Sequence, residues 1–152
     1  MCTSFMGELM TATHNFGVAP IRAVTTADTF KAALYLASAT INASTTVYSS
    51  TGEVTGSGYS AGGIVVTNAT PPTATNASTT AGVAFFTPSA SLTYTSVTLT
   101  TAFDAVLIYN SSQSNKSVSV HTFGSQTISA GTFTLTMPAN TTTTALLRLA
   151  TT

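Results

Sequence analysis

The chain has 152 residues, and only eight of them carry a formal charge, four basic and four acidic. A typical soluble domain is about a quarter Asp, Glu, Lys and Arg, whereas here 34 Thr and 18 Ser dominate the polar residues. Clustered Lys and Arg bind nucleic acid and anionic membrane surfaces, so four scattered basic residues exclude both partners.

Cys2 is the one cysteine, so no intrachain disulfide forms. We expect neither a signal peptide nor a membrane span, because no basic-then-apolar pattern or long apolar stretch is present.

The first residues predict a short amphipathic segment over residues 3–13. Apolar side chains recur there at helix-like spacing, namely Phe5, Met6, Leu9 and Met10. Residues 14–17 have the composition of a turn that ends this segment. We therefore expect an N-terminal arm of residues 1–16, helical or extended, followed by one β domain of residues 17–152.

The apolar period then changes to two, which is typical of strands. In residues 29–36 apolar side chains fall on one face and Lys31 falls on the other, which predicts a half-buried strand. Residues 51–63 carry five of the ten glycines and predict a turn-rich connection, after which a strand resumes at 64–67. Residues 71–80, rich in Pro, Asn, Ser and Thr, predict a surface loop.

The second half of the chain alternates more clearly. Its strand candidates are residues 83–86, 92–94, 97–100, 105–109, 117–123, 132–137 and 145–150. Residues 105–109 are continuously apolar, as expected of a strand covered on both faces, and residues 110–115 predict a polar loop. A turn is expected between Gly124 and Gly131. About eight short strands without helical crossovers predict an all-β fold, an antiparallel β-sandwich of jelly-roll type.

No motif indicates catalytic or metal-binding residues. A triad built from His14 or His121 with any of the serines lacks a Gly-x-Ser-x-Gly elbow to support it. The two histidines, one cysteine and four acids show no close ligand pair for zinc, and no loop holds two carboxylates for calcium. We therefore expect no enzyme activity, no catalytic residues, no bound metal and no cofactor.

Two repeated polar patterns allow more than one interpretation. Six of the seven asparagines precede x-Ser/Thr, as in glycosylation acceptors, but asparagines that bond their own backbone in turns explain them. Alternate threonines place hydroxyl ladders on one strand face, at Thr98, Thr100, Thr132, Thr134 and Thr136. Ice-binding proteins use flat Thr arrays, so ice binding is a remote alternative, although the chain lacks their regular short repeat.

Three segments carry a family resemblance through their order and spacing. They are THNF at 13–16 with TFKAALY at 29–35, Tyr48 with GEVTGSGYSAGG at 52–63, and FDAVLIYNS at 103–111. Together they resemble a family of small Thr/Ser-rich virion proteins of tailed bacteriophages. The resemblance runs from about Phe5 to Ala150 and is weakest in residues 71–82.

Members of this kind resemble capsid decoration, or cement, proteins, which are β-sandwich or jelly-roll modules on the outer shell. The resemblance implies a structural virion protein on the outer capsid surface, made in the bacterial cytoplasm. It also implies binding to the major capsid protein and a homo-oligomer, either a dimer or a trimer. A tail-associated or host-surface-binding module of the virion is the alternative.

The N-terminal arm is the candidate partner-binding segment. Its candidate residues are Phe5, Met6, Leu9, Met10 and Phe16. Docking of this arm on a partner and burial of the arm against the chain's own sandwich are equally compatible with its amphipathic pattern.

Overall fold

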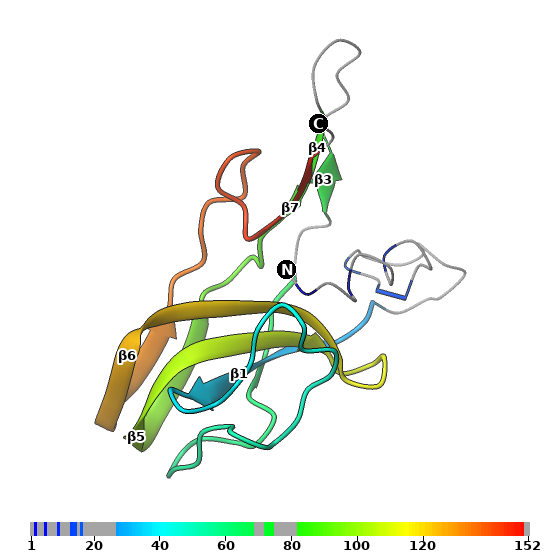
Figure 1. The fold of residues 1–152 in the computed structure, drawn as a ribbon. Helices are drawn as coiled ribbons and strands as arrows, with labels where there is room; N and C mark the ends of the chain where they lie inside the picture. Colours follow the sequence, from blue (N-terminus) through cyan, green and yellow to red (C-terminus); the bar gives the residue numbers. More distant parts are fainter. Residues whose placement is uncertain are drawn as a thin grey trace.

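The computed structural model describes residues 27–68, 72–74 and 82–150, together with Cys2, Phe5, Leu9, Thr13, His14 and Phe16. Seven strands form within this part of the chain, and Figure 1 shows their arrangement. They are β1 (Phe30–Leu36), β2 (Ile64–Val65), β3 (Thr73–Ala74), β4 (Val83–Phe86), β5 (Leu92–Asn110), β6 (Lys116–Leu135) and β7 (Leu147–Ala150).

All the strand pairs are antiparallel. One sheet has the order β2-β1-β5-β6 and the other has the order β3-β4-β7. The prediction of an all-β, antiparallel fold is therefore confirmed.

Within the predicted N-terminal helical segment, Phe5 and Leu9 have helical backbone, and the other residues of 3–13 apart from Thr13 lie outside the described part. The predicted loop at 71–80 contains the short strand β3, and its remaining residues apart from Pro72 also lie outside that part.

The described chain has seven strands instead of about eight, because β5 spans three of the predicted strands and β6 spans two. They contain 19 and 20 residues. The predicted turn between Gly124 and Gly131 is wrong, since β6 continues through it. Its small polar residues lie in a strand whose backbone stays paired to β5, and the pairing there shifts register at bulges. Ser96 and Ala130 have positive φ angles of 53° and 49° at these irregularities.

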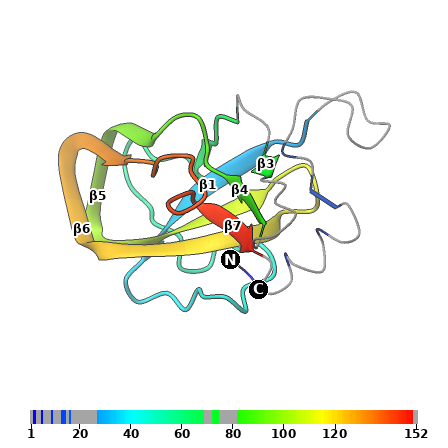
Figure 2. The ribbon, with the colours of Figure 1, turned by 90° about the horizontal axis from the view of Figure 1, so that it is seen from above.

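The β5–β6 hairpin is bent so that its two halves share one core (Figures 1 and 2). Leu92 and Val106 line the same cavity, although 14 residues of straight strand would separate them by about 46 Å. The ring of Phe133, which faces Tyr94 across the hairpin, also lies 5.0 Å from the ring of Phe103 between centroids. The main core fills this fold and includes Phe30, Leu34, Leu99, Ile108 and Val118.

The prediction that the first strand is half-buried is wrong, because both faces of β1 are covered. Phe30 and Leu34 belong to the main core, whereas Tyr35 packs with Leu107 and Tyr109 in a second cluster on the opposite face. Residues of the chain that follows β1 cover that second face, namely Ala39, Ile41 and Tyr48. The local period reports one face of the strand and contains no information about this cover. The double coverage predicted for 105–109 is confirmed by the same two clusters.

Residues 37–63, which we call the covering connection, supply backbone partners to the outer edges of three strands. Its hydrogen bonds reach β1, β5 and β6, through Val54 N to Leu34 O (3.0 Å), Thr98 N to Ser57 O (2.8 Å) and Ser117 N to Thr46 O (3.0 Å). Buried or edge backbone groups need such partners. The connection therefore closes sheet edges that would otherwise be open.

A glycine is required where the covering connection enters β2. Gly63 has a φ angle of 73°, and a Cβ at this position would overlap the backbone carbonyl of Ala32 on β1.

We expect Gly63→Ala to lower the free energy of unfolding by about 2–4 kcal/mol, because the strained φ and the overlap add. Urea unfolding measures the change. Gly124→Ala is the control, since open space surrounds its Cβ position; equal urea midpoints for the two variants would contradict this tight packing.

Candidate functional site

The covering connection contains a buried carboxylate, that of Glu53. Glu53 is 6% exposed and accepts three hydrogen bonds, from Tyr48 Oη (2.6 Å), Tyr59 Oη (2.7 Å) and the backbone N of Gly62 (2.8 Å). Buried carboxylates are stable only when they are hydrogen-bonded in this way. The three donors come from the covering connection itself, so Glu53 holds its turns together.

Four of the five tyrosines hydrogen-bond to this carboxylate or to the backbone of the covering connection, and the fifth, Tyr94, stacks on Tyr59 at 6.0 Å between ring centroids. Tyr109 Oη donates to Gly62 O (2.8 Å), and Tyr35 Oη donates to Ser49 O. Tyr59 Oη also accepts a hydrogen bond from the backbone N of Leu34 on β1 (3.0 Å). The remaining contacts are Tyr94 Oη to Ala32 O (2.8 Å) and the stacking of Tyr48 on Tyr109 at 4.6 Å between ring centroids. Glu53 and the tyrosines thus form one network, which we call the Tyr–Glu network.

The Tyr–Glu network keeps its hydroxyl groups protonated. Burial raises the pKa of Tyr35 to about 12. Burial, and then the negative charge of Glu53, also raise the pKa values of the other four tyrosines, Tyr48, Tyr59, Tyr94 and Tyr109. These groups are therefore protonated hydrogen-bond donors near neutral pH, and the arrangement acts as an anchor.

Sequence reasoning missed this network. The signal was present in the composition, because Glu53 is the one charged residue between Lys31 and Asp104 and it lies among tyrosines in a glycine-rich segment. A lone carboxylate in so neutral a stretch needs a specific partner if it is buried. Nothing in the local pattern showed that Glu53 is buried.

Removal of the Glu53 carboxylate tests the anchor. We expect Glu53→Ala to lower the free energy of unfolding by about 3 kcal/mol, since two tyrosine hydroxyls and one backbone N–H lose a charged acceptor. Urea unfolding monitored by tyrosine fluorescence measures this loss. Asp104→Ala is the matched control, because this half-buried carboxylate makes no hydrogen bond within the described part of the chain. An equal loss in both variants would show that Glu53 is not a special anchor.

The raised tyrosine pKa values predict alkaline unfolding. Each tyrosine holds its proton more tightly in the folded chain than in the unfolded chain, where the pKa is about 10. The resulting stability is fully present below pH 10 and is lost as the pH rises toward 12, the folded value for Tyr35. Phenolate absorbance and circular dichroism, recorded together from pH 8 to 13, measure this. Ionisation of all five tyrosines near pH 10 with the fold retained would contradict it.

The two histidines occupy structural positions. His14 is 8% exposed, and its Nδ1 lies 3.1 Å from Nδ2 of the fully buried Asn110, which also donates to Asp28 Oδ2 (2.8 Å). His121 Nε2 lies 2.9 Å from Ser119 Oγ, and burial lowers the pKa of this histidine. Ser119 is fully buried, whereas His121 is partly exposed and lines a cavity with Val106 and Phe123.

The predicted partner-binding residues divide into a placed group and an unplaced group. Phe5 is 2% exposed in the main core, and Leu9 and Phe16 pack against that core with part of their surface exposed. The Phe16 ring stacks on Phe30 at 4.5 Å between centroids. Met6 and Met10 lie outside the described residues. The placed residues therefore contact the chain's own core, and partner binding by this segment stays a prediction.

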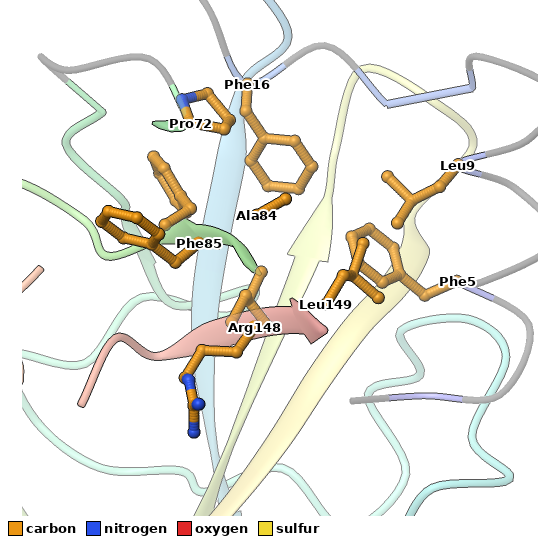
Figure 3. A pocket seen from close by; sticks show the side chains of 10 residues that line it. Phe5, Leu9, Phe16, Pro72, Ala84, Phe85, Arg148 and Leu149 are labelled. Atoms are coloured by element: carbon orange, nitrogen blue, oxygen red, sulfur yellow. The ribbon is translucent and has the colours of Figure 1, made fainter. Parts of the chain in front are cut away.

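An apolar groove separates the N-terminal residues from the smaller sheet (Figure 3). It is lined by Phe5, Leu9, Phe16, Pro72, Ala84, Phe85, Phe86, Leu147, Arg148 and Leu149. In Figure 3, Leu9 and Leu149 lie at one end of the groove and Pro72 at the other. Leu149 on β7 is 42% exposed. We call this feature the Phe5–Leu149 groove.

The threonine ladders lie on exposed strand faces of the bent hairpin. Thr134 faces Thr93 across the β5–β6 pairing, and their Oγ1 atoms lie 3.4 Å apart. Register shifts separate this pair from Thr98 and Thr100. These register shifts interrupt the row of threonine hydroxyls along the hairpin.

In the described part of the chain, no three His, Cys, Asp or Glu side chains are grouped as metal ligands. Among the same residues there is no helix with the length and apolar character needed to cross a membrane.

Comparisons with protein-family models, with curated proteins and with solved structures found no match to this chain.

Proposed function

We propose that this chain is a structural bacteriophage virion protein, a capsid decoration module that binds the major capsid protein shell and stabilises it. The observation that carries the proposal is the Phe5–Leu149 groove, an apolar surface on a chain of zero net charge. The groove leaves Leu149 partly exposed beside buried aromatic side chains, so an apolar side chain of a partner can contact it. The phage family resemblance supplies the class of partner.

The chemistry of the surface suits repeated packing against other subunits. Neutral hydroxyl groups lose less solvation free energy than charged groups when they are buried, and Thr and Ser cover much of the exposed hairpin. A protein that binds only the assembled shell stabilises it by mass action. The proposal includes the jelly-roll form of the sandwich and oligomerisation, as the resemblance implies.

A second candidate is a tail-associated module that binds host-surface glycans. It is favoured by a cavity of about 490 Å³ on the covering connection, which is rich in hydroxyl-bearing side chains. They are Ser38, Thr40, Thr45, Ser49 and Thr51, with Tyr35 beside them. Copy number separates the two candidates, because hundreds of copies per particle indicate the shell and a few copies indicate the tail.

Thermal DNA release from particles tests the decoration role. We expect particles that carry the chain to release DNA at a higher temperature than particles that lack it, because binding favours the assembled shell. Fluorescence of a DNA-binding dye during heating measures the release. Equal release temperatures would overturn the stabilising role.

Substitution in the Phe5–Leu149 groove tests the contact surface. We expect Leu149→Asp to weaken shell binding by about 30- to 100-fold, because a carboxylate would be buried without a partner. Val65→Asp is the matched control, since Val65 is a strand residue that is 59% exposed and does not line the groove. Co-sedimentation with shells measures binding, and circular dichroism verifies that both variants fold. Equal binding by the two variants would place the contact elsewhere.

A further inference from the structure

Several outer strand edges of the larger sheet are closed by the chain itself. The covering connection bonds β1 through Val54 and β5 through Ser57. At the start of β6, Thr46 bonds Ser117, and the backbone N of Cys2 donates to Val118 O (3.0 Å). Open strand edges are templates for pairing with other chains, so this coverage restricts where such pairing can occur.

The outer edge of β6 after Val118 differs from these covered edges. Within the described part of the chain, residues 119–135 make backbone hydrogen bonds across strands only to β5. Many side chains along this stretch are exposed, among them Thr122, Ser125, Thr127, Ser129, Thr132 and Thr134. β6 is also the last strand in the order β2-β1-β5-β6. Within the described residues, this stretch of the β6 edge therefore has no backbone partner other than β5.

The β6 edge after Val118 has no charged side chain to prevent pairing with another strand, although register shifts interrupt its pairing to β5 near Gln126 and Ala130. No Asp, Glu, Lys or Arg occurs between Lys116 and Arg148, and Lys on edge strands is a common protective device. The chain as a whole has zero net charge, so no long-range repulsion separates two copies. Thr, Ile, Val and Phe along β6 are favourable strand residues. A second uncharged strand can therefore pair with this edge without charge repulsion.

We propose that two copies of this chain pair through their β6 edges, antiparallel about a two-fold axis, and join their larger sheets into one. An antiparallel pair of identical edges is self-complementary, because each outward N–H meets an outward C=O. The Val118 carbonyl points outward toward Cys2, so the two-residue period places the backbone groups of Val120 and Thr122 on the same side. This inference is independent of shell binding, which uses the Phe5–Leu149 groove.

A charge introduced on the β6 edge tests the pairing in the full chain. Thr127→Lys places an ammonium group near the middle of the edge, where two-fold pairing brings it near its counterpart. We expect analytical ultracentrifugation to show a dimer of the natural chain and a dissociation constant at least about tenfold higher for the variant. Thr55→Lys, an exposed threonine of the covering connection, is the matched control and retains the dimer.

Three results would overturn the proposal. They are a monomer at all concentrations up to about 1 mM, a closed trimer, or equal dissociation constants for Thr127→Lys and Thr55→Lys. Amide hydrogen exchange gives a second test that needs no variant, because Val120 and Thr122 amides gain protection as the concentration rises through the dissociation constant. Unchanged protection of both amides in a dimer would place the interface elsewhere. Leu149→Asp retains the dimer, so failure of shell binding remains distinguishable from failure of edge pairing.

Discussion

The hydrogen bonds accepted by Glu53 hold together a long connection that has almost no regular structure of its own. Residues 37–63 contain turns and isolated bridges but no strand, so side-chain anchors and close backbone approaches set their position. Tyr59 links the two layers directly, since its hydroxyl donates to Glu53 and accepts from the β1 backbone at Leu34. Once fixed, the connection covers one face of the sheet and closes several strand edges. The Glu53 carboxylate thus stabilises the connection that hydrogen-bonds to β1, β5 and β6.

The bent β5–β6 hairpin is the second constraint on the fold. Bulges at Ser96 and Ala130 allow two strands of about twenty residues to curve around a shared core. The aromatic cluster of Tyr94, Phe103 and Phe133 joins the two halves of this hairpin. The smaller sheet packs near this core through Phe86, which contacts Phe16 at 5.2 Å between ring centroids. Phe16 thus lies between the two sheets, and with Phe5 and Leu9 it lines the Phe5–Leu149 groove.

The segments that carry the phage resemblance contribute the buried polar contacts of the fold. His14 meets Asn110, and Glu53 meets Tyr59 and Gly62. Such contacts are costly to lose in the interior, which gives these segments a structural role. The surface of the described residues is rich in hydroxyl groups and includes the Phe5–Leu149 groove and the β6 strand edge. Both features suit a protein whose proposed work is to pack against other subunits.

The sequence by itself determined the all-β class, the first strand, the polar turn after Asn110 and the double burial of residues 105–109. These features depend on local apolar period and turn composition, which are properties of neighbouring residues. The tertiary structure alone decided that β6 continues through Gly124 and Gly131, that both faces of β1 are covered, and that Glu53 is buried. Each of these depends on contacts that the local apolar period does not show, such as the pairing of β6 to β5 and the hydrogen bonds from Tyr48, Tyr59 and Gly62 to Glu53. A local pattern contains no information about such partners, because the fold brings them together.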